Sequence, residues 1–326
     1  MLKKIIISFA VLISISIFYL FYIKQDDDSQ QISFLLDWKM TSFYSPYLLA
    51  EAKGYYKQEG LDIQILEGQG AETTAKLVGQ NKYQIGSCNA AATAISVDHN
   101  IPVVSIAVLE QDAVTAIFSL KDSNIQFPKD LIGKTLGVRY YDISHKEYIA
   151  MMNAMNIPTQ QVKEVSVGWE LQPLLTGQVD ALYNYAYNMP IVLKLQGKSI
   201  NTILVKDNGV NGYGSNLIVN KEFAKNNKDA IKGFIRASRR AWEDTIKNPE
   251  EAIAILKNKY PEIDERIALY TLKEQLHWLN NSKGIFSQSR ERWDNVLSTY
   301  KSLNMISDKI NSSDVFTNEY QDEIEE

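Results

Sequence analysis

The chain has 326 residues, a formal net charge of −5, 45% hydrophobic residues and 22% charged residues. These values are ordinary for a globular protein, and the length is sufficient for a large core divided between two lobes. No basic stripe indicates a nucleic-acid partner. The single cysteine, Cys88, excludes an internal disulfide, and the three histidines lie too far apart in sequence for a metal-ligand spacing. We therefore expect neither a metal site nor a cofactor.

The N-terminal segment contains an apolar run from Ile5 to Ile23, preceded by two lysines and followed by three consecutive aspartates. This run is long enough to span a bilayer. Its basic start and acidic exit favour an N-terminus inside the cytoplasm, with the remaining chain outside. We expect residues 1–30 to form an uncleaved membrane anchor and a linker. A cleaved signal peptide is the alternative.

From Ile32 onward, predicted strands and helices alternate, which is typical of an α/β fold with a mostly parallel sheet. Residues 34–66 predict a strand, a polar and aromatic loop, a helix and a second strand. Ser45 is a candidate N-cap for the helix, and Pro46 suits its first position. Because ligands of open α/β sheets bind beyond the carboxyl ends of strands, the loop over residues 37–44 is a candidate site.

The same alternation continues through the middle of the chain and predicts further strands that end in polar groups. The next predicted elements are a helix over 71–78, a strand over 83–86, an Ala-rich helix ending at 98, strands over 103–108 and 116–120, a short helix and a strand within 129–138, and a helix ending at 155.

An internal similarity predicts two lobes built alike. In two places a helix ends at glycine, at Gly79 and at Gly177, and a short apolar strand then leads to polar residues. We expect the strands over 116–120 and 216–220 to lie side by side and to carry the chain between the lobes. The predicted division is residues 31–120 for lobe 1, 121–214 for an inserted lobe 2, and 215–326 for helices that return to brace lobe 1.

Catalytic motifs are missing from the sequence, which has no G-x-S-x-G elbow, no P-loop and no H-E-x-x-H. We therefore expect a binding protein and not an enzyme. The recurring feature is an aromatic residue beside small polar residues at strand ends. This mixture suits a small, flat, partly polar organic ligand. The predicted ligand-binding residues are Asp37, Trp38, Thr41, Tyr44, Ser87, Asn89, Tyr141, Asp142, Ser144, Tyr183, Asn184 and Tyr187.

Several short motifs resemble one protein family. They are Asp37-Trp38, Leu49-Ala50, Lys53-Gly54-Tyr55-Tyr56 and Glu59-Gly60-Leu61-Asp62, together with the closing segment Val315-Phe316-Thr317-Asn318-Glu319-Tyr320. In these motifs the chain resembles the NMT1/THI5-like solute-binding proteins, which are related to the sulfonate- and nitrate-binding components of ABC importers. The likeness runs from about residue 33 to residue 320.

The resemblance implies a type II periplasmic-binding-protein fold, in which two α/β lobes are joined by a two-strand hinge. It implies a monomer in the periplasm or at the outer face of the cytoplasmic membrane. Its partners would be an ABC permease and a small heteroaromatic ligand similar to a thiamine-pyrimidine precursor. A sulfonate or a riboflavin-like solute is the alternative ligand.

The first loop departs from the family pattern DW-x-PN-x2-H-x-G-x-Y. Only Asp37 and Trp38 match, so only these two are carried over as ligand contacts. The departures are Met40 for Pro, Thr41 for Asn, Tyr44 for His, Pro46 for Gly and Leu48 for Tyr.

Two alternatives of other classes remain. One is an enzyme of pyrimidine biosynthesis, similar to the fungal synthases that consume their own histidine and carry a cysteine-rich motif. Tyr44 stands where that histidine would be, one cysteine cannot form the motif, and Lys39 is the only other candidate in the loop. The other alternative is an extracellular ligand-sensing domain, which would need a membrane partner for signalling.

Overall fold

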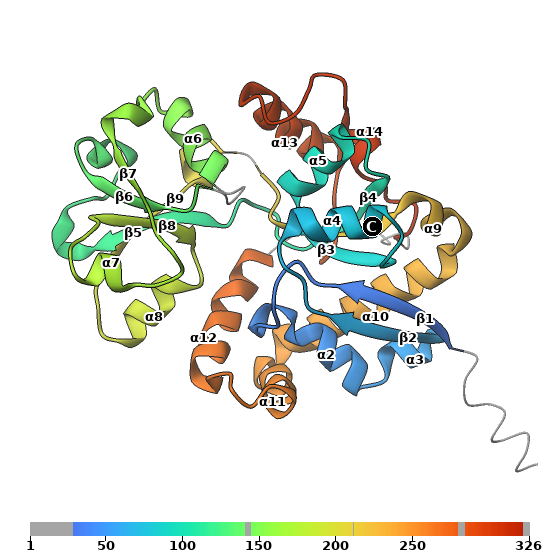
Figure 1. Ribbon diagram of the computed structural model, residues 1–326. Coiled ribbons are helices and arrows are strands. Elements are labelled where there is room, and N and C mark those ends of the chain that lie inside the picture. The colour runs from blue at the N-terminus through green and yellow to red at the C-terminus, as the bar shows by residue number, and fades with distance from the viewer. Residues whose placement is uncertain (1–28, 141–144, 211, 280–283, 322–326) are drawn as a thin grey trace, which may run out of the picture.

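The computed structural model describes residues 29–140, 145–210, 212–279 and 284–321, and contains two five-stranded sheets with helices packed on them (Figure 1). The predicted anchor over residues 5–23 lies outside the described residues. Across those four described stretches, no helix combines the length and the apolar character that crossing a membrane requires.

The first sheet has the strand order β2-β1-β3-β10-β4. Strand β1 runs parallel to both β2 and β3, whereas β10 is antiparallel to β3 and β4. The strands are β1 (Gln30–Leu35), β2 (Leu61–Leu66), β3 (Ile85–Asn89), β4 (Val103–Val108) and β10 (Ser215–Asn220). The helices that follow its strands are η1 (Ser42–Tyr44), α2 (Ser45–Ala52), α3 (Tyr55–Gln58), α4 (Ala71–Gly79) and α5 (Ala90–Asp98).

The C-terminal helices pack on this first lobe. Helices α10 and α11 lie against α2, α12 lies against η1, and α14 lies against α5 and β4 (Figure 1). The core beneath them is aromatic: the Phe34 ring centroid lies 4.8 Å from that of Tyr47 and 5.1 Å from that of Phe234. The helices are α9 (Lys221–Asn226), α10 (Lys228–Lys247), α11 (Pro249–Lys259), α12 (Glu265–Leu276), η6 (His277–Leu279), α13 (Arg290–Ser302) and α14 (Ser312–Val315).

The second sheet, with the order β7-β6-β8-β5-β9, repeats the arrangement of the first. Strand β6 is parallel to β7 and β8, and β5 is antiparallel to β8 and β9. The elements of this second lobe are β5 (Thr115–Leu120), η2 (Lys121–Ser123), η3 (Pro128–Leu131), β6 (Thr135–Val138), α6 (His145–Ala154), η4 (Thr159–Gln161), β7 (Lys163–Ser166), α7 (Gln172–Leu175), β8 (Ala181–Tyr185), α8 (Met189–Leu195), β9 (Ile200–Leu204) and η5 (Lys206–Asn208).

The predicted pairing of residues 116–120 with 216–220 is wrong, because β5 lies in the second sheet and β10 in the first. The chain crosses between the lobes one segment earlier, at residues 109–114, and returns just before β10. The two crossings are joined by hydrogen bonds from the amide of Leu109 to the carbonyl of Ser215 (2.8 Å) and from Gly214 to the carbonyl of Glu110 (2.9 Å). After the first crossing the chain joins the second sheet as β5, and after the return crossing it joins the first sheet as β10. In these sheets the buried backbone groups of both strands find hydrogen-bond partners.

Candidate functional site

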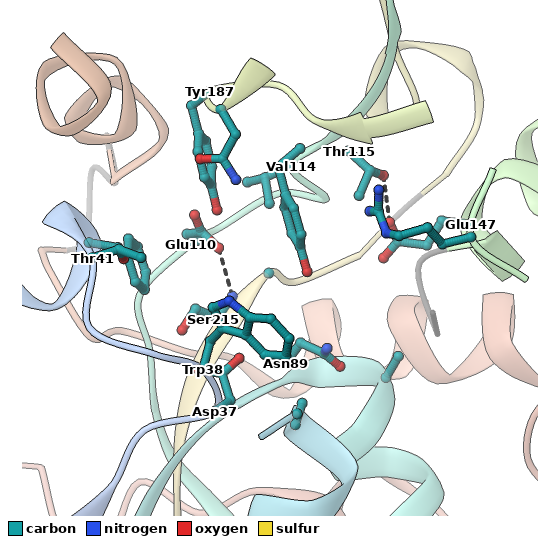
Figure 2. Close-up of a pocket in the computed structure, with 18 of the residues that line it drawn as sticks. Asp37, Trp38, Thr41, Asn89, Glu110, Val114, Thr115, Glu147, Tyr187 and Ser215 are labelled. Atoms are coloured by element: carbon teal, nitrogen blue, oxygen red, sulfur yellow. Dashed lines mark hydrogen bonds between the residues drawn. The ribbon is translucent and has the colours of Figure 1, made fainter. Parts of the chain in front are cut away.

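A cavity of about 720 Å³ lies between the two lobes, at the carboxyl ends of their parallel strands. Both lobes and both crossings supply its walls, as Figure 2 shows for 18 of the lining residues. The lining residues used below are Asp37, Trp38, Thr41, Tyr44, Glu72, Asn89, Glu110, Thr115, Arg139, Glu147, Trp169, Tyr185, Tyr187 and Ser215.

The loop after β1 forms the wall on the first lobe, and it is held by its own hydrogen bonds. The carbonyls of Asp37 and Trp38 accept from the amides of Gly70 (2.7 Å) and Gly68 (3.1 Å). The Tyr44 hydroxyl donates to Asp37 Oδ1 at 2.6 Å. Burial and the Asp37 carboxylate raise the Tyr44 pKa well above its usual value, so this phenol stays protonated.

Gly68 explains why this loop can lie so close to its neighbours. A Cβ atom at this position would be 1.9 Å from the carbonyl oxygen of Leu36, at the end of β1. Only glycine allows the backbone to approach that closely. Asn89 completes the wall at the end of β3, where its side chain caps α5 by accepting from the amide of Ala92 at 2.8 Å.

The wall on the second lobe consists mainly of aromatic side chains. Tyr185 and Tyr187, at and just beyond the end of β8, stack with ring centroids 5.9 Å apart. After β6 and β7, the Arg139 guanidinium lies 3.8 Å from the centre of the Trp169 ring. Trp169 also reaches Trp38 across the cavity, with ring centroids 5.9 Å apart, so that one aromatic contact joins the two lobes.

Glu110 lies on the first crossing, where the walls meet, and only 2% of its surface is exposed. Its Oε2 accepts from the amide of Ser215 at 2.9 Å, whereas Oε1 has no hydrogen-bond partner among the described residues. The Tyr187 hydroxyl points toward this carboxyl (Figure 2). Burial raises the Glu110 pKa to about 7 against the lowering effect of hydrogen bonds from the Ser215 amide and the Tyr187 hydroxyl, and the carboxylates of Asp37 and Glu147 add to the rise.

The charge of the cavity is mainly negative. Among the described lining residues, Arg139 is the one basic side chain, against four acidic residues. One of these, Glu147, accepts a hydrogen bond from the Thr115 hydroxyl at 2.6 Å. The acidic residues are Asp37, Glu72, Glu110 and Glu147.

Half of the twelve predicted binding residues line this cavity. These are Asp37, Trp38, Thr41, Tyr44, Asn89 and Tyr187. Tyr141, Asp142 and Ser144 lie outside the described residues.

The structure places the other three predicted residues inside the lobes, away from the lining. Ser87 is buried within β3, and Tyr183 lies in the core of the second lobe, 6.0 Å from Tyr148 between ring centroids. The Asn184 amide is also buried and accepts from the amide of Tyr185 at 2.7 Å. These three residues lie one or two positions before the last residue of β3 or β8. Side chains at those positions point into the lobe, whereas Asn89 and Tyr185, at the strand ends, line the cavity.

Sequence reasoning missed Glu110, Arg139 and Trp169. Glu110 follows the buried strand β4, and the available signal was a pair of acidic residues, Glu110 and Asp112, between two apolar strands. Trp169 follows β7, whose sequence Lys163–Ser166 is polar and only partly buried. No apolar alternation marks such an edge strand, so the aromatic residue beyond it was not connected with a strand end.

Two α/β lobes around a central cavity define this fold as that of the type II periplasmic binding proteins. The periplasmic aliphatic sulphonate binding protein SsuA from Escherichia coli has this fold, with a TM-score of 0.73 at 14% identity, covering 92% of this chain and 96% of that one. The NMT1/THI5 like family profile matches residues 42–252, and the chain belongs to this family.

Two of the relatives illustrate the functional names that similar proteins carry. The formylaminopyrimidine-binding protein of Halalkalibacterium halodurans is 23% identical over 300 residues, covering 90% of this chain and 91% of the relative. The 4-amino-5-hydroxymethyl-2-methylpyrimidine phosphate synthase of Candida albicans is 28% identical over 313 residues, covering 90% and 88% respectively. The relatives of this chain thus include one named as a binding protein and one named as an enzyme.

Proposed function

We propose that this chain is the extracytoplasmic solute-binding component of an ABC importer, and that it binds a small heteroaromatic ligand similar to a thiamine-pyrimidine precursor. The observation that carries the proposal is the cavity between the lobes, with aromatic side chains on both walls. Trp38 and Tyr44 come from the first lobe, and Trp169, Tyr185 and Tyr187 come from the second.

The dimensions of the cavity support a ring-shaped ligand. Small-molecule sites commonly enclose about 300–1,000 Å³, with mostly apolar walls and a few convergent polar groups. This cavity, at about 720 Å³, falls in that range. Aromatic pairs contribute about 0.5–1.5 kcal/mol beyond their buried area, so rings on both walls favour a flat ligand between them.

The charge of the lining argues against an anionic ligand. A sulfonate would meet one guanidinium, that of Arg139, which already lies over Trp169. It would also face the acidic side chains of Asp37 and Glu147. Like charges at short range inside a cavity of low dielectric are strongly unfavourable, so a neutral or cationic ligand suits these walls better.

The apolar N-terminal run and the fold support a proposal for location and partner. The apolar run over residues 5–23 would hold the chain at the outer face of the cytoplasmic membrane. Closure of the lobes about the crossings would enclose the ligand, driven by contacts that both walls make only in the closed state. The closed form would then deliver its ligand to a permease, and the chain would act as a monomer.

A thermal-shift screen of the purified full-length chain against pyrimidines, flavins and sulfonates tests this proposal. We expect stabilisation by a pyrimidine, and loss of that stabilisation in Trp38→Ala. Tyr270→Ala is the matched control, because Tyr270 is also about half exposed but does not line the cavity. Stabilisation by a sulfonate alone, or an unchanged pyrimidine response in Trp38→Ala, contradicts the proposal.

The relatives named as synthases favour a second candidate, an enzyme of pyrimidine biosynthesis on the same fold. By the resemblance, Tyr44 stands where those synthases would have a histidine, and its hydroxyl is bonded to Asp37. The lining that the structure describes includes neither histidine nor lysine. Absorbance of bound pyridoxal phosphate in the purified protein, with a pyrimidine formed on incubation, would support the enzyme over the binding protein.

A further inference from the structure

The unpaired oxygen of Glu110 is a feature that ligand shape alone does not explain. A buried polar atom without a partner costs about 1–3 kcal/mol, and more when it is charged. Glu110 is 2% exposed, its Oε1 has no hydrogen-bond partner in the described part of the chain, and it lines the cavity. Such an atom at the floor of a site is placed to receive a group from the ligand.

The backbone fixes which oxygen faces the cavity. The Ser215 amide, at the start of β10 beside the second crossing, donates to Oε2 at 2.9 Å. A Cβ atom on Gly214 would lie 2.5 Å from this oxygen, so glycine there allows the carboxyl to lie flat against the crossing. One oxygen is therefore held by the hinge while the other remains available.

Two of the other three carboxyls of the lining are already engaged with protein groups, and the third, that of Glu72, is exposed to solvent. Asp37 Oδ1 accepts from Tyr44, and Glu147 Oε2 accepts from Thr115. Tyr187 lies nearest to Glu110 on the second wall, and its pKa is raised well above the usual value by burial and by the Glu110 charge. It therefore remains a protonated phenol whose hydroxyl interacts with the same carboxyl, so an amino group of the ligand would share that carboxyl with Tyr187.

Resting on the function proposed above, we infer that Glu110 is the specificity-determining residue of the cavity, and that its Oε1 accepts a hydrogen bond from an amino group attached to the ring of a nitrogen heterocycle. A charge-assisted bond of this kind would pair the buried oxygen, and the ring would lie between the aromatic walls. Ligands without an N–H group at that edge would leave the carboxylate unpaired, and anions would face it directly.

The substitution Glu110→Gln tests this inference with little change of shape. The Ser215 amide needs an oxygen, so the glutamine carbonyl takes the place of Oε2 and the amide NH₂ faces the cavity. The free atom thereby changes from an acceptor to a donor, while the bond between the crossings is kept. An amino group on the ligand then meets another donor.

Isothermal titration at pH 8, where Glu110 is ionised, with 4-amino-5-hydroxymethyl-2-methylpyrimidine and with its analogue lacking the amino group provides the readout. In the unmodified chain we expect the amino compound to bind about 10–100-fold more tightly, the range for a hydrogen bond to a charged group. In Glu110→Gln this preference should fall to within about threefold, mainly through weaker binding of the amino compound. Glu67→Gln is the control, because Glu67 bonds the nearby amide of Met40 (2.8 Å) and does not line the cavity.

The outcomes separate this inference from the proposed function. If the unmodified chain binds both pyrimidines and Glu110→Gln keeps the amino preference, the role of Glu110 is refuted and the binding function stands. If the unmodified chain binds neither compound, both are refuted. If Glu67→Gln loses the preference equally, the effect is one of overall charge, and the role of Glu110 is again refuted.

Discussion

The two walls of the cavity are built differently. On the first lobe, the loop after β1 is fixed by Tyr44, Gly68 and Gly70, which bond Asp37 and Trp38. On the second lobe, Trp169 is 49% exposed, and its recorded neighbours are other cavity side chains, Trp38 and Arg139. One wall has its conformation set before a ligand arrives, and the other presents apolar surface for the ligand to cover.

This difference assigns a separate task to each lobe. A wall that is already ordered loses little conformational entropy on binding, so the first lobe provides the site where a ligand docks. The exposed ring of Trp169 would be buried further when the lobes close, and that burial would favour the closed state. Mutations in the first wall should therefore affect both folding and binding, whereas mutations in the second should affect binding alone.

Gly68→Ala should give the largest effect, because the added methyl group would overlap the Leu36 carbonyl. We expect a loss of about 3 kcal/mol in unfolding free energy, at the upper end of the range for overpacked sites, together with loss of ligand binding. Urea denaturation and titration calorimetry measure the two effects. A variant with unchanged stability would show that the first wall is not rigid.

Glu110→Gln should increase the stability of the ligand-free chain near neutral pH. Burial raises the Glu110 pKa from 4.5 to about 7. The contribution of Glu110 to the free energy of unfolding is therefore fully present below pH 4.5, where the carboxyl is protonated in both states, and is lost as pH rises through 7. The difference between these pKa values corresponds to about 3 kcal/mol, at 1.36 kcal/mol per pKa unit.

In urea denaturation at pH 8, we therefore expect Glu110→Gln to be about 1–3 kcal/mol more stable than the unmodified chain, with no difference at pH 4. A gain in stability combined with a loss of ligand preference would identify the carboxyl as a group kept for function at the expense of stability. Equal stability of the two proteins at pH 8 would contradict the buried, unpaired state of this carboxyl.

Tyr44→Phe tests the hydrogen bond within the first wall. Removing the hydroxyl leaves Asp37 Oδ1 without its donor, and the Asp37 side chain is only partly buried, so solvent replaces part of the loss. We expect about 1 kcal/mol less stability and a similar weakening of ligand affinity. If affinity alone fell, Tyr44 would be a direct ligand contact and not a support of the loop.

Trp169→Ala should have the smallest effect on stability. The ring is half exposed in the ligand-free chain, so we expect the unfolding free energy to change by less than about 0.5 kcal/mol. Ligand affinity should fall about tenfold, because one aromatic contact and its buried area are lost. A large loss of stability would show that the second wall is as preorganised as the first.

The first wall could be predicted from the sequence because its signals are local. Residues 34–66 combine a buried strand, a polar loop and a Ser-Pro helix start, and the structure has β1, a loop, η1 and α2 in that order. The helix start differs slightly: Ser45 is the first residue of α2, and its hydroxyl bonds the carbonyl of Ser42 in place of capping the helix.

The position of the two crossings between the lobes could not be predicted, because it depends on which sheet each buried strand joins. The strands β5 and β10 are both buried runs, and apolar sequence alone does not say which strands pair. The crossings were therefore placed one strand too late, and Glu110, which lies on the true crossing, was missed.

Titration calorimetry of the full-length chain with 4-amino-5-hydroxymethyl-2-methylpyrimidine and, separately, with an alkanesulfonate tests most directly whether the cavity between the lobes binds a heteroaromatic solute. We predict saturable binding of the pyrimidine at one site per chain, with no measurable heat from the sulfonate. Saturable binding of the sulfonate without binding of the pyrimidine would contradict this account.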